Sequence, residues 1–254
     1  MAERLDGTVA LITGASSGIG AATALALAKQ GAAVALVARR VERLQQLADE
    51  ITKGGGRTLV IETDVTDKQQ AQDAVERTVR ELGRLDTLVN NAGVMLLGPI
   101  ENSPLEEWDR MVQLNVLGLL YTAHAALPHL LKAAEDSPRR VADLINISSV
   151  AGRVARSGSG VYNTTKFGVV AFTESLRQEV TKRHVRVSVV EPGAVATELT
   201  DHLRPEIRDL QQQRFAGVER MESEDIADAI EYIVTRPRRM AINEMLIRPT
   251  EQEA

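Results

Sequence analysis

Tyr162 and Lys166 are four positions apart in a segment with a helical pattern. Residues four apart share a face of a helix, so the phenol and the ammonium are expected side by side. A neighbouring cation stabilises the phenolate and lowers the pKa of the tyrosine from its ordinary value of about 10. Such a phenol can act as a general acid or base near neutral pH. This spacing is common in helices by chance, so the pair gains weight only beside other motifs.

A glycine-rich turn at 13–20 follows an apolar run and leads into an alanine-rich helical pattern. Glycines let the backbone approach a phosphate closely, and the N-terminus of the next helix supplies free N–H groups and positive potential. The spacing is G-x-x-x-G-x-G, not the G-x-G-x-x-G of the common dinucleotide fingerprint. The turn predicts a nucleotide site with contacts from Gly14, Ser16, Ser17, Gly18, Ile19 and Gly20.

The second apolar run ends at Ala38, Arg39 and Arg40, where many NAD-binding domains carry an acid for the ribose hydroxyls. An arginine at this place can instead contact a 2′-phosphate and stack on the adenine. The alternative is that both arginines are solvated at the start of a charged helix. The sequence therefore predicts NADP(H) as cofactor, with Arg39 as the main phosphate contact and Arg40 as a secondary one.

The elements that position these motifs alternate along the chain. The expected strands are Val9–Thr13, Ala33–Val37, Thr58–Glu62, Thr87–Asn90, Ala142–Ser148, Arg186–Val190 and Glu244–Ile247. The expected helices are Gly18–Gln30, Val41–Lys53, Asp67–Glu81, Pro104–Leu131, Gly160–Arg183 and Ser223–Val234. Nearly continuous apolar strands between helices indicate an α/β fold with a doubly wound parallel sheet of about seven strands. Residues 1–254 are expected to form a single Rossmann-type domain.

Two longer segments interrupt this alternation. The segment 133–140 is polar and charged and is expected to be a surface connection. The segment 194–217 mixes Thr, His, Arg and Gln with few apolar positions. Long connections in compact domains are often functional lids, so we expect this second segment to close over a substrate. The alternative is a mobile surface loop.

The composition excludes several classes of function. A formal net charge of −5 argues against nucleic-acid binding, and the absence of cysteine excludes disulfides and thiol chemistry. No secretory leader is visible, so a cytoplasmic protein is expected. The segment Met111–Leu131 carries no charged residue, yet its Gln, Asn, Pro and two His would be costly in hydrocarbon. We expect a helix buried in the protein or in an interface, and no membrane span.

Together these residues resemble the short-chain dehydrogenase/reductase family over essentially the whole chain. The resemblance rests on 13–20, Asp64-Val65, Asn90-Asn91-Ala92-Gly93, Asn115, Ser149, Tyr162, Lys166, Pro192-Gly193 and Thr197. Within the family, the runs 95–99, 165–168, 176–180 and 247–250 are similar to an actinobacterial branch that includes clavulanic acid dehydrogenase. Departures from that branch, including the longer connection at 133–140, leave the substrate open.

The resemblance implies a role for each catalytic residue. Tyr162 would protonate a carbonyl oxygen as hydride arrives, or take the hydroxyl proton in the reverse direction. Ser149 would hold that oxygen, since the family spacing selects it over Ser148. Lys166 would lower the pKa of the tyrosine and bind the nicotinamide ribose. Asn115 would hold a water that links the lysine to solvent, although a lone Asn in such a helix is more often a satisfied core group.

The resemblance also implies contacts to the cofactor. Asp64 would accept a hydrogen bond from the adenine amino group while the Val65 backbone contacts the ring. Asn90 would brace the sheet. The remaining implied contacts, along the ribose and around the carboxamide, are Asn91, Ala92, Gly93, Tyr162, Lys166, Pro192, Gly193, Val195 and Thr197. No metal is expected, because the four histidines show no ligand-like grouping with acids.

The expected activity is the NADP(H)-dependent interconversion of a carbonyl compound and an alcohol, with a clavulanate-type aldehyde reductase as one candidate. The alternative is a non-catalytic NADP(H)-binding redox sensor, which would be expected to have a broken set of catalytic residues. Family resemblance also implies a homo-oligomer, a tetramer or a dimer. The expected substrate pocket is largely apolar, and Arg153 or Arg156 could pair with a substrate carboxylate or lie at the surface. Its candidate lining residues are Val94, Met95, Leu96, Val150, Val154, Ala194 and Val195.

Overall fold

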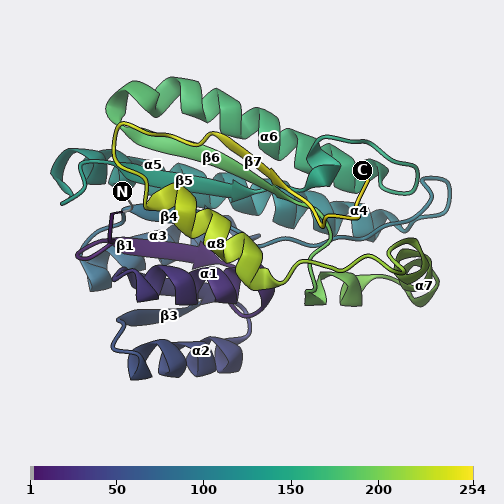
Figure 1. Ribbon diagram of the computed structural model, residues 1–254, viewed down its shortest axis with the longest axis horizontal. Helices are drawn as coiled ribbons and strands as arrows, with labels where there is room; N and C mark the ends of the chain where they lie inside the picture. The colour runs from purple at the N-terminus through teal and green to yellow at the C-terminus, as the bar shows by residue number, and fades with distance from the viewer. Residues whose placement is uncertain (1–2, 254) are drawn as a thin grey trace.

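Seven apolar runs within residues 3–253, the part of the chain that the computed structural model describes, form one parallel sheet (Figure 1). The strand order is β3-β2-β1-β4-β5-β6-β7. The predicted α/β class, doubly wound topology and strand number are confirmed. The strands are β1 (Val9–Thr13), β2 (Ala33–Ala38), β3 (Thr58–Glu62), β4 (Thr87–Asn90), β5 (Ala142–Ile147), β6 (Val185–Pro192) and β7 (Glu244–Ile247).

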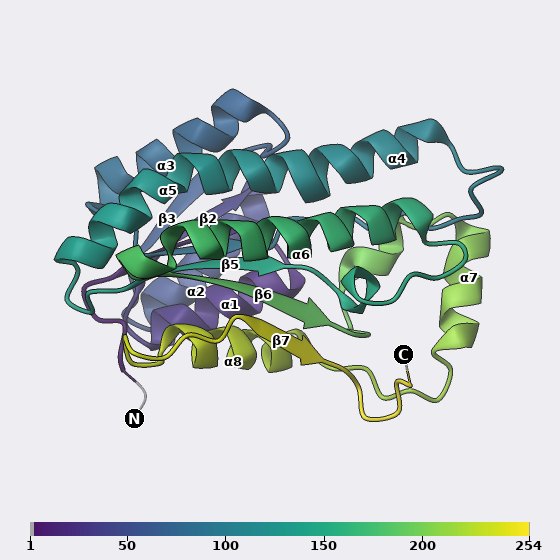
Figure 2. The same cartoon turned by 90° about the horizontal axis from the view of Figure 1, so that it is seen from above.

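Helices cover both faces of this sheet (Figure 2). One layer contains α1 (Gly18–Lys29), α2 (Val41–Lys53) and α8 (Ser223–Val234). The opposite layer contains α3 (Lys68–Leu82), α4 (Leu105–Val112), α5 (Leu119–Asp136) and α6 (Gly160–Val180). Strands covered on both sides must be apolar on both faces, which explains the continuous apolar runs in the sequence.

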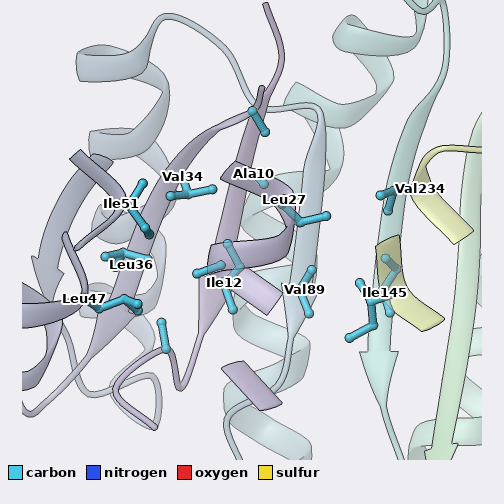
Figure 3. Packing of buried hydrophobic residues seen from close by; sticks show 14 of the residues in the cluster. Ala10, Ile12, Leu27, Val34, Leu36, Leu47, Ile51, Val89, Ile145 and Val234 are labelled. Carbon is cyan, nitrogen blue, oxygen red and sulfur yellow. The ribbon is translucent and has the colours of Figure 1, made fainter. Parts of the chain in front are cut away.

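Alternating strand residues build the two halves of the core. Ile12 and Leu36 point to the layer of α1 and α2, where Leu27 and Leu47 pack against them (Figure 3). Their neighbour Leu11 instead joins the cluster beneath α3, α5 and α6. This period of two fixes the register of the sheet, because a slip of one residue would exchange the two cores.

The strand order reverses between β1 and β4, which lie side by side at the centre of the sheet. The glycine-rich turn follows β1, and the segment from Asn91 to Gly93 follows β4. In open α/β sheets the ligand crevice forms at the carboxyl ends of the strands beside such a reversal. The topology therefore brings these two motifs to one place.

The predicted helix Pro104–Leu131 is wrong in its continuity and its end. A π-helical turn, Gln113–Gly118, separates α4 from α5, and α5 continues to Asp136. The predicted surface connection 133–140 is therefore half helical. Arg139 is also buried there, beside Asp143 and bonded to the carbonyl oxygens of Val234 and Arg236. These partners compensate the cost of burying the guanidinium. The polar composition of the segment alone does not predict that burial.

Within residues 3–253, the helical stretch Leu105–Asp136 is long and apolar enough, by length and composition alone, to cross a membrane. Its most apolar window is 39% buried, and α5 packs against α3, β4 and β5. This is the position of a core helix that covers a sheet, in line with the expectation of a buried or interface helix.

The segment 194–217 is more regular than a long loop. It contains a 3-10 turn, Glu198–His202, and the helix α7 (Pro205–Arg214). Leu203 and Ile207 are buried and anchor it to a cluster that includes Leu97 and Tyr162. The helix was missed because Ile207 is its single buried residue, too few to produce an amphipathic pattern.

Candidate active site

The glycine-rich turn is held against the segment after β4 by Asn91. Its side-chain amide donates to the carbonyl oxygens of Thr13 and Gly14, at 3.0 and 3.3 Å. A Cβ on Gly20 would lie 2.5 Å from this amide nitrogen, and Gly14 has φ +67°, in the left-handed region. Side chains at these two positions would therefore displace Asn91 or strain the turn.

The first turn of α1 faces the cavity without a side-chain cap. Ser17 is the N-cap residue, but its hydroxyl makes no bond to the N–H groups of the helix. Those N–H groups and the positive end of the helix suit a phosphate. The hydroxyls of Ser16 and Ser17 instead accept hydrogen bonds from Arg40, at 3.0 and 2.6 Å. The turn thus fits the pyrophosphate of a dinucleotide.

Arg39 and Arg40 leave the end of β2 with different environments. Arg39 has a 66% exposed side chain whose nearest ionic partner is Asp64, at 3.9 Å. Arg40 also pairs with Glu198, and together Arg40 and Arg43 hold the pKa of that carboxyl at about 2. Of these two arginines, Arg39 is therefore the more available for a new anion.

Tyr162 and Lys166 lie one turn apart on α6, and both are buried, at 6% and 7% exposed. The Lys166 ammonium donates to the carbonyl oxygen of Ile147 at 2.9 Å and lies 5.8 Å from the centre of the tyrosine ring. Ser149 hydrogen-bonds to the tyrosine. The hydroxyl of Ser148 donates to the backbone oxygen of Lys166, which leaves Ser149 as the serine that faces the phenol.

The expected lowering of the tyrosine pKa by the lysine is not the dominant effect in this geometry. Burial raises the pKa of Tyr162 to about 12, and the hydrogen bond with Ser149 opposes this rise. Burial also lowers the pKa of Lys166 to about 8. Desolvation favours the neutral form of both groups, and the ammonium is directed at Ile147 rather than at the phenol. The site therefore holds a protonated phenol, ready to donate.

Asn115 lies in the π-helical turn and is 1% exposed. Its side chain accepts from the backbone N–H of Val94 and donates to the carbonyl oxygen of the same residue, both at 2.8 Å. It also donates to Thr165 at 3.2 Å. A Cβ on Gly93 would lie 3.3 Å from the Asn115 oxygen and 3.7 Å from the Lys166 nitrogen. Asn115 thus braces the segment after β4 beside the lysine.

The turn after β6 is fixed by the C-terminal part of the chain. The backbone N–H of Gly193 donates to Ile247 at 2.7 Å, and that of Ala194 donates to the side chain of Gln252 at 2.8 Å. Val195 forms a β-bridge with Met221. Sequence reasoning missed Gln252, because a single glutamine in a short tail has no periodic or motif signal.

The other residues singled out in the sequence, Asn90, Asp64 and Val65, are held by hydrogen bonds or by burial. Asn90 donates to Asn146 and accepts from Thr122, which braces the sheet as expected. The Asp64 carboxylate accepts from the backbone and hydroxyl of Thr66. Val65 is buried against Gly118, the last residue of the π-helical turn, where a Cβ would lie 3.1 Å from Val65.

One cavity of about 410 Å³ joins these elements. It is lined by every predicted catalytic and cofactor residue except Asn115 and Gly20, which stand behind it. The predicted pocket residue Leu96 does not line it, whereas the neighbouring Leu97 does, although both are buried in the same cluster. Among residues 3–253, no group of His, Cys, Asp or Glu could hold a metal ion.

Of the two arginines predicted as possible partners of a substrate carboxylate, Arg153 and Arg156, the second lines the cavity and the first does not. Arg153 is absent from the cavity wall within the described chain and is paired with the fully buried Glu191, at 2.7 Å, and with Glu244. These carboxylates raise its pKa. The prediction that Arg153 could pair with a substrate carboxylate is therefore wrong, because Glu191 and Glu244 already neutralise the charge of the arginine. Arg156 does line the cavity.

Similarity to known proteins extends over nearly the whole chain. The chain is 38% identical over 248 residues to the glycine betaine reductase of Emericella nidulans. The aligned region covers 98% of this chain but 19% of that larger protein. It is also 38% identical over 247 residues to an uncharacterized oxidoreductase of Staphylococcus saprophyticus, with 96% of each protein covered.

Solved structures share the fold. The closed form of a serine dehydrogenase complexed with NADP+ matches with a TM-score of 0.88 and 30% identity, over 97% of each chain. A 3-ketoacyl-(acyl-carrier-protein) reductase from Brucella melitensis complexed with NADH matches with a TM-score of 0.82 and 29% identity, over 96% of this chain and 98% of that one. The profile of the short chain dehydrogenase family matches residues 8–208. The chain therefore belongs to the short-chain dehydrogenase/reductase family of oxidoreductases.

Proposed function

We propose that the protein is an NADP(H)-dependent oxidoreductase that interconverts an aldehyde or ketone and an alcohol. The observation that carries the proposal is the convergence of Ser149, Tyr162 and Lys166 with the glycine-rich turn on one cavity. The first three supply a hydroxyl, a proton donor and a cation, while the turn supplies a phosphate site.

Each residue has a task in this reaction. Ser149 holds the carbonyl oxygen, and Tyr162 donates its phenolic proton to that oxygen. Lys166 binds the nicotinamide ribose with the ammonium that now contacts Ile147, and its charge stabilises the tyrosinate that remains. The bound nicotinamide cofactor supplies the hydride. In the direction of oxidation, the tyrosinate takes the proton of the alcohol.

The turn after β6 orients the nicotinamide ring. The Thr197 hydroxyl and the Val195 backbone hold the carboxamide, and Gln252 keeps the start of this turn in place through Ala194. The backbone of Ala92 and Gly93, on the cavity wall, would contact the ribose. Asn115 holds the water that returns a proton to Lys166. These assignments follow the family resemblance, and the residues named here other than Asn115 line the cavity.

The cofactor is NADP(H), and the end of β2 makes the choice. Known relatives bind either NADP or NADH, so the fold alone does not decide it. Ala38 offers no carboxylate to the ribose hydroxyls, and the exposed Arg39 beside it is available to a 2′-phosphate. Asp64, at the same end of the cavity, accepts from the adenine amino group.

The substrate is an aldehyde or ketone with apolar surface. The walls near the catalytic residues include Val94, Met95, Val150 and Val154. The resemblance of the runs 95–99 and 247–250 to the clavulanic acid dehydrogenase branch makes a clavulanate-type aldehyde the specific candidate. The segment 194–217, which carries cavity residues on α7, closes over this substrate.

The protein is proposed to be a cytosolic homo-oligomer. A tetramer is the favoured state and a dimer the alternative. Val112 on α4 and Phe167 on α6 are 39% and 42% exposed, on helices that pack side by side. A second copy is the simplest cover for such apolar surface. Light scattering at micromolar concentration tests this point, and a monomer mass would contradict it.

A turnover screen tests the activity. Purified protein is mixed with NADPH or NADH and a panel of aldehydes and ketones, and the loss of reduced cofactor is followed by absorbance. Turnover of at least one apolar aldehyde with NADPH is expected. Tight NADPH binding without turnover on any member of the panel would instead support the redox-sensor alternative.

A further inference from the structure

The cavity has an excess of positive charge that the rest of the protein lacks. The whole chain has a formal net charge of −5. Within the described residues, the acids that line the cavity are Asp64 and Glu198, and the second is already paired with Arg40 and Arg43. The lysine and arginines that line it are Arg39, Arg40, Arg156, Lys166, Arg214 and Arg220.

The NADP(H) site accounts for only part of this charge. Arg39 and Arg40 lie at the end of β2, at the adenosine side, and the N-terminus of α1 serves the pyrophosphate. Lys166 is assigned to the nicotinamide ribose. Three arginines therefore have no cofactor phosphate assigned to them: Arg156, Arg214 and Arg220.

Arg156 lines the same cavity as the catalytic residues, and among the described residues its guanidinium has no hydrogen-bond or ionic partner. Its backbone is fixed, because its N–H donates to Asn163 at 3.2 Å and its carbonyl oxygen accepts from Ser159 at 3.1 Å. Asn163 follows Tyr162 on α6 and also donates to Val154 on the same wall. Within residues 3–253, the guanidinium of Arg156 makes no hydrogen bond or ion pair, although the residue is half-buried.

Arg214 and Arg220 belong to the closing segment and the loop that follows it. Both guanidinium groups lie over the ring of Phe215, at 5.7 and 5.9 Å from its centre. Stacking on a ring leaves the N–H donors at the edge of a guanidinium available to an anion. Among the described residues, neither arginine has a carboxylate partner.

We infer that Arg156, with Arg214 of the closing segment and Arg220 of the loop that follows it, binds an oxoanion of the substrate. The inference rests on the proposed carbonyl chemistry at Tyr162 and narrows its substrate class to aldehydes or ketones that carry a carboxylate or a phosphate ester. Both groups accept the paired hydrogen bonds that a guanidinium donates. The apolar wall at Val150 and Val154 contacts the carbon skeleton between the carbonyl and the anion.

Equilibrium binding tests this site without requiring turnover. The probes are the alcohols 4-(hydroxymethyl)benzoate, 4-(hydroxymethyl)phenyl phosphate and the neutral 4-(hydroxymethyl)benzamide, together with their 3-substituted isomers. Each is titrated by calorimetry into the protein saturated with NADPH, so that no hydride transfer can occur. Charge-assisted hydrogen bonds predict that an anion binds roughly 10- to 150-fold more tightly than the matched amide.

The variants separate the site from the cofactor. Arg156→Gln should reduce the ratio of anion to amide affinity about tenfold or more, and Arg156→Lys should retain part of it. Arg214→Gln and Arg220→Gln should each lower the ratio less. Arg208→Gln, on the same helix α7 but outside the cavity wall, is the control and should leave it unchanged. The Kd for NADPH should stay within about twofold in all of them.

Three binding results would overturn the inference: equal affinity for the anion and the amide in every pair, an unchanged affinity ratio in Arg156→Gln, or a fall in NADPH affinity in Arg156→Gln instead of a fall in that ratio. A preference for benzoate or for phosphate identifies the anion, and either supports the site. The corresponding aldehydes then test the chemistry separately. If an anion preference holds but no aldehyde is reduced by NADPH, the anion site stands and the proposed function fails. If acid and amide aldehydes are reduced equally well, the function stands and the inference fails.

Discussion

Glu198 joins the closing segment to the glycine-rich turn through Arg40. The two side chains meet at 2.8 Å, and Arg40 at the same time donates to Ser16 and Ser17. A second arginine, Arg43, pairs with the other oxygen of the carboxylate. The closing segment 194–217 is therefore tied to the glycine-rich turn that is proposed to hold the cofactor phosphates.

Replacing Glu198 with Gln should loosen this tie. The pairs are exposed, so an effect on stability below about 1 kcal/mol is expected. Release of NADPH should become about two- to fivefold faster, because the segment opens more often. Stopped-flow fluorescence of bound NADPH measures the rate. Glu206→Gln, an exposed acid on α7 outside the cavity wall, is the control, and an unchanged rate in Glu198→Gln would contradict the coupling.

Replacing Tyr162 with Phe should abolish most catalysis and spare the fold. The change removes one hydroxyl from a buried ring, so cofactor affinity should remain nearly intact. Turnover should drop by about 10²–10⁴, the range attributed to general acid–base catalysis. The control is Tyr232→Phe, at an exposed tyrosine on α8 that does not line the cavity. Retention of more than about a tenth of wild-type turnover would exclude Tyr162 as the proton donor.

The buried lysine should make stability depend on pH in the alkaline range. Burial lowers the pKa of Lys166 to about 8 from 10.5, so the unfolded chain binds more protons between these values. The free energy of unfolding should therefore rise from pH 8 towards pH 10, by up to about 3 kcal/mol. Above pH 10 the sign reverses, because burial raises the pKa of Tyr162 to about 12 and the unfolded tyrosine ionises first.

Urea unfolding at fixed protein concentration from pH 7 to 10 measures this slope. Lys166→Met removes the titrating group, so its stability should vary less over the range. Parallel curves for the wild type and Lys166→Met would show that the lysine has no lowered pKa in the folded protein.

Much of the fold was predictable because its signals are local. The strands β1, β3, β4 and β7 match their predicted bounds, since each is a short apolar run between polar residues. The predicted motifs also meet at one cavity, because the carboxyl ends of parallel strands share an edge.

What escaped prediction depends on contacts between distant residues. The pairing of Arg153 with Glu191 joins positions 38 residues apart, and Gln252 reaches Ala194 across 58. The tyrosine pKa was expected to fall because a helix face predicts proximity to Lys166. Burial and the bond to Ile147 decide the outcome, and neither is visible in the spacing.

Exchange of the residues at the end of β2 should reverse the cofactor preference. The double variant Ala38→Asp with Arg39→Gln introduces a carboxylate for the ribose hydroxyls and removes the exposed cation that meets the 2′-phosphate. That phosphate carries nearly two negative charges, and charge-assisted contacts to it contribute about 1.5–3 kcal/mol, or about 10- to 150-fold in affinity. Steady-state kinetics with NADPH and NADH should show the reversal mainly in KM.

Arg43→Gln, an arginine nearby on α2 that lies outside the cavity wall, should keep the wild-type preference. Equal use of NADH and NADPH by the wild type would refute the role of Arg39 and leave the assignment of Tyr162 intact.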